Sequence, residues 1–234
     1  SAEVASEYEF TGGRDPWRTL VVAVTQSGET ADTLSALRRA KRAGARTLAI
    51  TNTLGSTVTR ETEDSVFIRA GPEIGVAATK TFCSQVATLA LLSVYIARER
   101  DTMSSSEARE LLSNLRGLPG AVQQVLDAEA GIRDVAEEHL DSEAFFFIGR
   151  RLGKPTALEG ALKLKEISYD HAEGFPAGEL KHGPLALVTP ETPVLAILTE
   201  GSRASETLNN VKEVESRGAP VLGAASEVVD AEKF

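Results

Sequence analysis

The sequence is poor in cysteine and in basic charge. Its 234 residues include one cysteine, Cys83, so neither an internal disulfide nor a thiolate zinc site can form. This composition fits a reducing cytoplasm. Lys and Arg number 25 against 34 Asp and Glu, and this net charge of −9 argues against a nucleic acid or an anionic membrane as partner. A small phosphorylated ligand remains compatible, because it needs only a few local donors.

Long uninterrupted apolar runs are also missing. The longest lies near Leu89–Leu92 within the wider segment 86–97, and a membrane span needs about 20 residues, so no spanning helix is expected. Residues 1–10 contain three glutamates and no basic residue, unlike a signal peptide. Hydrophobic residues at 42% and charged residues at 25% are typical of a globular protein with one large or two small domains.

Apolar runs alternate with amphipathic stretches, which predicts an α/β protein. Strands are expected at 20–24, 47–50, 66–68, 144–148 and 193–198, and helices at 32–43, 79–98, 104–115, 121–139, 156–168 and 204–217. The strand–helix–strand order predicts parallel sheets with right-handed crossovers. Gly44 stands where a glycine usually ends a helix. The apolar helix at 79–98 is expected to be buried on most sides, with Cys83 as a core thiol.

The chain contains an internal repeat at an offset of 174 residues. Residues 20–49 align with 194–223 without a gap, with six identities and the same strand–helix–glycine–strand layout. The repeat predicts two copies of one α/β subdomain, at 1–118 and 119–234, separated near the glycines and proline at 117–120. Each copy is expected to be incomplete, so that the chain is an excerpt of a longer protein.

The first segment whose residues suggest a binding or catalytic role is TQSGET, residues 25–30, between a predicted strand and a helix N-terminus. It offers the hydroxyls of Thr25, Ser27 and Thr30, the amide of Gln26 and a flexible Gly28. Free backbone N–H groups and the helix dipole favour an anion there, which suggests phosphate binding without lysine or metal. The alternative is an N-cap loop with Thr30 or Asp32 as the cap. The loop at 199–204 in the second copy lacks this cluster, so the turn itself does not require it.

Two further segments carry titratable groups. Glu159, Lys163 and Glu166 are spaced i, i+4, i+7 and fall on one helix face. They form either a surface ion-pair stripe or a base beside an electrostatic stabiliser. His182 lies in a Gly/Pro loop and could shuttle protons. The other two histidines lack the partner spacing of a metal site, so no metal is expected.

Four segments together resemble the SIS (sugar isomerase) family, and more closely the isomerase domains of glutamine–fructose-6-phosphate aminotransferases. They are 26–34 (QSGETADTL), 72–80 (PEIGVAATK), 157–169 (ALEGALKLKEISY) and 178–187 (GELKHGPLAL). The resemblance covers essentially the whole chain. It implies two SIS subdomains, each a parallel sheet flanked by helices in a three-layer, flavodoxin-like arrangement.

The resemblance also implies roles for individual residues. The sugar-phosphate loop of the family is matched by Thr25, Gln26, Ser27 and Thr30, and a backbone contact to the sugar is matched by Val76. Glu166 matches the base that moves a proton between C1 and C2, and Lys163 matches its catalytic neighbour. His182 matches the ring-opening histidine that reaches the partner subunit's site, so a homodimer is implied. The implied reaction converts fructose 6-phosphate and ammonia to glucosamine 6-phosphate in the cytoplasm, without a cofactor.

Several features depart from the family pattern. A glutaminase domain with an N-terminal cysteine nucleophile is expected in the intact protein, whereas this chain begins at Ser1. A Gly-Thr-Ser segment before the first strand and an imine-forming lysine in a C-terminal tail are missing, and Ala78 replaces a common serine. The chain alone is therefore expected to bind sugar phosphate weakly or to be inactive. Two alternatives remain: a plain sugar-phosphate isomerase or deglycase, and a non-catalytic sugar-phosphate sensor.

Overall fold

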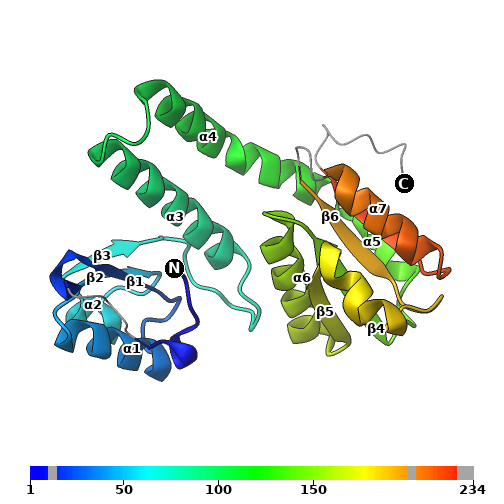
Figure 1. Cartoon of the computed structure of the whole chain (residues 1–234), viewed down its shortest axis with the longest axis horizontal. Helices are drawn as coiled ribbons and strands as arrows, with labels where there is room; N and C mark the ends of the chain where they lie inside the picture. Colours follow the sequence, from blue (N-terminus) through cyan, green and yellow to red (C-terminus); the bar gives the residue numbers. More distant parts are fainter. Residues whose placement is uncertain (10–14, 200–203, 226–234) are drawn as a thin grey trace. The chain divides into compact units, whose positions relative to one another are not determined.

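The chain divides into two compact units, Ser1–Val122 and Gln123–Phe234. The computed structural model describes residues 1–9, 15–199 and 204–225 (Figure 1). Each unit contains a parallel sheet with helices packed on it, so the predicted α/β class is confirmed. The second-copy loop at 199–204 lies largely outside the described residues.

The first unit is built on a three-stranded sheet in the order β1-β2-β3. Its strands are β1 (Leu20–Val24), β2 (Arg46–Thr51) and β3 (Asp64–Phe67), and its helices are α1 (Ala31–Arg42), α2 (Thr57–Glu61), α3 (Lys80–Glu99) and the start of α4 (Ser105–Asp127). Two 3-10 turns, η1 (Ala5–Glu7) and η2 (Pro16–Arg18), precede β1. In Figure 1, α1 and α2 cover one face of the sheet and α3 lies on the other.

Helix α1 shows how the sequence pattern produces this packing. Leu34 and Leu37 lie on one face of α1 and pack against Ala23, Ala49 and Val58. The helix ends as predicted at Gly44, whose φ of +92° is easily adopted only by glycine. The N–H of Gly44 donates to the carbonyl of Lys41 at 2.9 Å and that of Ala45 to Ala40 at 3.1 Å. These bonds satisfy the last carbonyls of α1 and turn the chain into β2.

Helix α3 differs from its prediction in two ways. Only Thr81 and Val94 of its 20 residues are buried, and Cys83 is exposed, so the helix is not enclosed and the thiol is not in the core. The reason is that β2 is the main element of the described chain against which α3 packs. Among the described helices, α3 is also the one that is long and apolar enough to cross a membrane, judged by length and composition alone. Core helices of globular proteins have the same length and composition.

Helix α4 runs through the predicted break. Gly117, Pro119 and Gly120 all lie inside it, and the following helix α5 (Glu129–Glu137) is shorter than expected. A proline inside a helix removes one backbone hydrogen bond. This turn is exposed, so water can solvate the freed carbonyl. The predicted subdomain boundary at residue 118 thus lies within a helix.

The second unit is built on a four-stranded sheet in the order β5-β4-β6-β7. Its strands are β4 (Ala144–Gly149), β5 (His171–Pro176), β6 (Val194–Leu198) and β7 (Val221–Ala225). Its longer helices are α6 (Gly153–Ser168) and α7 (Ala204–Glu215), and its 3-10 turns are η3 (Ala177–His182) and η4 (Pro184–Leu187). The second strand of this unit lies outside the first, which is the flavodoxin-like order.

Strand β4 separates the two cores of this unit. Its side chains alternate, so Phe145 and Phe147 pack under α6, while Phe146 and Ile148 pack with α7 and η3 on the other face. The sheet therefore has helical layers on both faces. Helix α6 begins at Gly153, before the predicted start, because Pro155 falls in its first turn, where no N–H is needed.

Candidate functional site

The TQSGET loop follows β1 at the carboxyl end of the strand. Its side chains partly hold the loop itself: the N–H of Gly28 donates to the Thr25 hydroxyl and that of Glu29 to the Ser27 hydroxyl, both at 3.2 Å. Both hydroxyl oxygens act as acceptors in these bonds, so their O–H groups can still donate to an anion. Thr25 is buried, whereas Ser27 is half-buried.

The loop is fixed against the start of α2. The N–H of Val58 donates to the carbonyl of Gly28 at 3.0 Å, and the N–H of Thr57 donates to the Glu29 carboxylate at 2.7 Å. The hydrogen bonds with Thr57 hold the pKa of Glu29 below its usual value. The sequence analysis missed Glu29, because nothing in its spacing points to Thr57.

The N-terminus of α1 is open to an anion. Thr30 is the N-cap residue, but its side chain does not cap the helix, and the first backbone bond runs from Leu34 N–H to the Thr30 carbonyl at 3.0 Å. The alternative in which the Thr30 hydroxyl serves as the cap is therefore not what the structure shows. An exposed hydroxyl and the first-turn N–H groups lie together at the positive end of the helix dipole.

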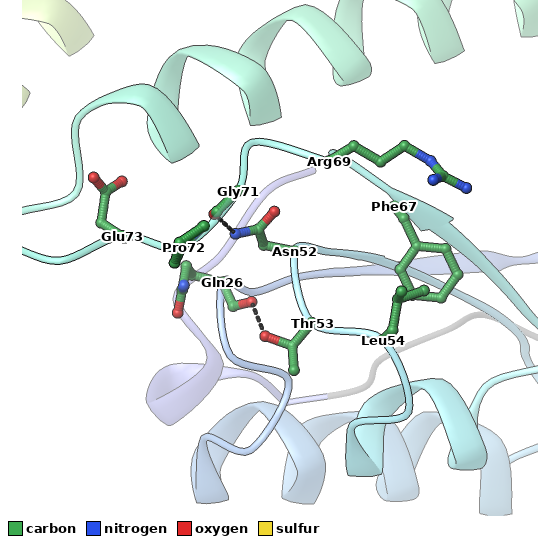
Figure 2. A pocket seen from close by; sticks show the side chains of 9 residues that line it. All are labelled: Gln26, Asn52, Thr53, Leu54, Phe67, Arg69, Gly71, Pro72 and Glu73. Carbon is green, nitrogen blue, oxygen red and sulfur yellow. Dashed lines mark hydrogen bonds between the residues drawn. The ribbon is translucent and has the colours of Figure 1, made fainter.

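A cavity of about 620 Å³ lies beside this loop, at the carboxyl ends of the three strands (Figure 2). Its volume is within the usual range for small-molecule sites. It is lined by Gln26, Asn52, Thr53, Leu54, Phe67, Arg69, Gly71, Pro72 and Glu73. Figure 2 shows Leu54 and Phe67 at one end of the cavity and Pro72 and Glu73 at the other.

Asn52 braces the wall of this cavity. Its Nδ2 donates to the carbonyl of Gly71 at 2.7 Å, and its Oδ1 accepts from the N–H of Ala70 at 3.0 Å. The Thr53 hydroxyl donates to the Gln26 carbonyl at 3.4 Å, which ties the first two strand ends together. The sequence analysis did not select Asn52, although its position just after a predicted strand was a usable signal.

Glu73 organises the PEIGVAATK segment. Its carboxylate accepts from the Thr81 hydroxyl at 2.6 Å and from the N–H groups of Thr81 and Thr79 at 3.2 and 3.3 Å. The bond from the Thr81 hydroxyl is the main reason that the pKa of Glu73 is lowered. Glu73 thus caps the start of α3, and the intervening residues form an open loop in which the Val76 side chain is 93% exposed.

Helix α6 brings its three predicted residues together. The Lys163 ammonium lies 2.5 Å from the Glu166 carboxylate and 3.4 Å from that of Glu159. Their side chains are only 20–29% exposed, so this is a half-buried ion cluster rather than a freely solvated stripe. Burial lowers the pKa of Lys163, but the hydrogen bond to Glu166 and the charges of both carboxylates outweigh it, and the pKa is raised. Lys163 therefore keeps its charge at neutral pH and suits electrostatic stabilisation.

His182 ends the η3 turn and is exposed. The turn is held in the core by Ala177 and Leu180, both fully buried. His182, Lys163 and Glu166 belong to the second unit, and Thr25, Gln26, Ser27 and Thr30 belong to the first. Within the described part of the chain, no group of His, Cys, Asp and Glu side chains is arranged to hold a metal ion.

The profile of the SIS domain family matches residues 3–95 and 140–228, more than half of the chain. The chain belongs to the SIS domain family. The two matched segments fall in the two sheet-containing units, so each unit carries SIS-type sequence. The resemblance that the four sequence segments indicated is therefore confirmed at the family level.

Named relatives of this SIS chain are aminotransferases. The glutamine–fructose-6-phosphate aminotransferase (isomerizing) of Halobacterium salinarum is 67% identical over 227 residues, or 97% of this chain and 38% of the relative. The enzyme of that name from Thermus thermophilus is 50% identical over 228 residues, or 96% of this chain and 37% of the relative. The chain thus spans well under half the length of these curated relatives.

A solved structure supports the same relationship. The C-terminal domain of glucosamine-fructose-6-phosphate aminotransferase from Francisella tularensis is 39% identical and superposes with a TM-score of 0.88, covering 90% of this chain and 60% of that one. At this identity and score, the likeness extends from the fold to much of the sequence.

Proposed function

We propose that this chain is the isomerase part of a cytoplasmic glutamine–fructose-6-phosphate aminotransferase. In this role it makes glucosamine 6-phosphate from fructose 6-phosphate and ammonia. The observation that carries the proposal is the half-buried pair of Glu166 and Lys163, 2.5 Å apart on α6. The relatives named above supply the substrate class, because 67% and 50% identity extend over nearly the whole chain. The intact protein then includes a glutaminase domain that delivers the ammonia.

The phosphate binds at the TQSGET loop in this proposal. The Ser27 and Thr30 hydroxyls and the first N–H groups of α1 donate to its oxygens, and Thr25 and Gln26 shape the loop. The backbone of Val76, in the loop that Glu73 holds, contacts the sugar. No cation is needed near the phosphate, because these neutral donors and the helix dipole together stabilise the negative charge.

The reaction moves one proton between the two carbons. Glu166 removes a proton from C1 of the fructose 6-phosphate imine while the imine nitrogen takes up another proton, which gives a C1=C2 enolamine. Glu166 then returns its proton to C2, and the C1 hydroxyl releases a proton that balances the one gained by the nitrogen, which leaves an aldehyde at C1 and the amine on C2. The Lys163 ammonium stabilises the negative charge that develops between the two carbons. His182 moves the proton that opens the sugar ring, and we assign it to the site of the partner subunit in a homodimer.

Two alternatives use the same fold differently. A plain sugar-phosphate isomerase or deglycase would share Glu166 and Lys163, and fold likeness alone does not separate it from an aminotransferase. A non-catalytic sensor would need the TQSGET loop but not the ion cluster of α6. The presence of both features favours a catalyst over a sensor.

The binding part of the proposal is tested by calorimetry on this chain. Glucosamine 6-phosphate is titrated, with inorganic phosphate and unphosphorylated glucosamine as comparison ligands. We expect binding that requires both sugar and phosphate, and at least about tenfold weaker binding after Ser27→Ala/Thr30→Ala, since each lost hydrogen bond to a charged group contributes roughly 1.5 kcal/mol or more. Thr102→Ala/Ser106→Ala removes two exposed hydroxyls elsewhere and should bind like the parent. Unchanged affinity in the loop variant would remove the phosphate assignment.

The catalytic part is tested by proton exchange in D₂O. Fructose 6-phosphate is incubated with ammonia and the intact protein, which supplies the segments that this chain lacks, and deuterium entry into the carbon-bound positions is followed by NMR. Glu166→Gln should abolish this exchange while calorimetric binding persists, because the amide keeps the shape but cannot accept the proton. Exchange at the parental rate in Glu166→Gln would exclude Glu166 as the base.

A further inference from the structure

Polar contacts connect the end of β4 to helix α7. Arg150 directly follows β4, and its Nε and Nη2 donate to Oδ1 of Asn210 at 3.3 and 3.0 Å. Its Nη1 lies 3.1 Å from a carboxylate oxygen of Glu206. The guanidinium thus uses all three of its nitrogens to hold one face of α7.

The contacts continue from α7 to the η3 turn. Nδ2 of Asn210 donates to the Glu213 carboxylate at 3.4 Å, and the other oxygen of Glu213 lies 2.6 Å from the ammonium of Lys181. Lys181 is the residue directly before His182. The contacts therefore run from β4 across α7 to the residue before the candidate ring-opening histidine. We call their four members the polar chain: Arg150, Asn210, Glu213 and Lys181.

Two observations show that the polar chain is built into the unit. Asn210 is only 4% exposed, and both ends of its amide are used, so it cannot exchange these partners for water. Gly178 lies so close to Arg150 that an added Cβ would meet the guanidinium atoms at 3.1 to 3.3 Å. The η3 turn thus lies directly against the first member of the polar chain.

The η3 turn needs such support for its exposed end. It is a six-residue 3-10 turn, and hydrogen bonds in this geometry are weak. Gly183 follows at a φ of +142°, which only glycine adopts readily, so the residue after His182 adds no stiffness. Ala177 and Leu180 anchor the turn in the core with Val211 and Val214, but this packing does not fix the direction of an exposed side chain.

We propose that Arg150, Asn210, Glu213 and Lys181 are positioning residues that fix the η3 turn and thereby the direction of His182. The inference rests on the proposed function, because the direction of His182 matters only if this side chain transfers a proton. Asn210 is the central member, since it is the buried link between the two charged ends.

The test is local hydrogen exchange in this chain, with Asn210→Ala compared to Asn209→Ala. Asn209 is its exposed neighbour on α7 and provides a control of the same residue type. We expect amides at 180–188 to exchange about ten- to a hundredfold faster in Asn210→Ala, since a buried polar group loses its partner, while amides of β4 and β6 keep their protection. Equal protection in the two variants, or a loss spread evenly over β4 and β6, would overturn the inference.

A second measurement follows the imidazole of His182 directly. The chain has three histidines, so its imidazole NMR signals are few and His182→Asn assigns one of them. Lys181→Met should shift or broaden that signal, and Lys181→Arg should restore it by keeping the ion pair. Lys181 is 57% exposed, so these variants fold even if Asn210→Ala does not. An unchanged signal in Lys181→Met would contradict the proposal. Neither readout involves sugar phosphate, so failure of the proposed function is detected separately by calorimetry.

Discussion

Gly28 is the residue on which the geometry of the TQSGET loop depends. It has a φ of +73°, and an added Cβ would lie 2.3 Å from Oγ of Ser56 and 2.8 Å from a methyl of Val58. Both contacts are too short for real carbon atoms. The glycine is therefore required by backbone conformation and by the close approach of α2, independently of any ligand.

Replacement of Gly28 separates these two requirements. Gly28→Ala should lower the free energy of unfolding by about 2–4 kcal/mol, because it adds a steric clash to an unfavourable φ. Gly55→Ala is the matched control: its φ is +68°, but nothing lies within 4 Å of the added Cβ, so a loss of about 1–2 kcal/mol is expected. Urea unfolding measures both, and equal losses would show that the packing against Ser56 does not matter.

The sequence predicted those site contacts that join residues close together along the chain. Glu159, Lys163 and Glu166 could be placed on one face because helix geometry alone determines it, and the structure brings them together. The partners of Glu29 and Asn52 could not be predicted, since Thr57 and Gly71 are distant in sequence and meet them only through the sheet. The roles of all the candidate site residues stay predictions: Thr25, Gln26, Ser27, Thr30, Val76, Lys163, Glu166 and His182.

At the scale of elements, α4 shows how an exposed helix can continue through poor helix formers. Gly117 and Gly120 have nothing within 4 Å of an added Cβ, and neither has a positive φ. Ser104 and Glu107 stabilise the helix start, where the Ser104 N–H donates to the carboxylate at 2.7 Å and the Glu107 N–H to the hydroxyl at 3.2 Å. This reciprocal pair is a capping box.

Alanine should therefore strengthen α4. Gly117→Ala and Gly120→Ala are each expected to raise the free energy of unfolding by about 0.5–1 kcal/mol, because alanine loses less backbone entropy in a helix. Ala121→Gly, in the same exposed stretch, should lower it by a similar amount. Circular dichroism during urea unfolding gives these values. Destabilisation by both alanine variants would show that the chain is not helical around Pro119.

The elements that sequence predicted well are those with strong periodicity and clear ends. The run Leu20–Val24 coincides with β1, and Gly44 ends α1 as expected. Strand β5 was missed because HAEGFP lacks the β-branched residues that indicate strands. The burial of α3 was overestimated, since composition does not tell which neighbours cover a helix.

At the scale of the whole molecule, four described carboxylates of the first unit have lowered pKa values. Glu29, Glu61, Glu73 and Glu107 all lie in the first unit, and each has its pKa lowered by a side-chain hydrogen bond. Glu61 is held by Arg38, and the others are held by Thr57, Thr81 and Ser104 respectively. Their folded pKa values lie below the unfolded value of about 4.3.

Acid should therefore weaken the first unit. A carboxyl with a lowered folded pKa stabilises the native state above about pH 4.3, and that stability is lost as the pH falls through the folded value. We expect peptides from 20–122 to lose hydrogen-exchange protection as the pH falls below about 4.3, after correction for intrinsic rates. In Glu29→Gln/Glu73→Gln this pH dependence should be shallower. The same pH dependence in the parent and in this double variant would contradict the argument.

The repeat made the overall plan accessible from sequence, because two copies of a strand–helix–strand unit imply two parallel sheets. The number of strands in each sheet could not be predicted from the repeat. Strand β1 and its counterpart β6 align in the repeat, yet β6 pairs with β4 and β7, whereas β1 pairs with β2 only.

The outermost place of β1 leaves its far edge without a neighbour among the described residues. Leu20 and Val24 are exposed along it. An open edge offers a row of backbone N–H and C=O groups as a template on which another strand can be added. In β6 the equivalent edge is already paired with β4, so of the two repeat copies the first alone offers this edge to another strand. Among the described strands, the edge of β1 is therefore a place at which two copies of the chain can associate by strand addition.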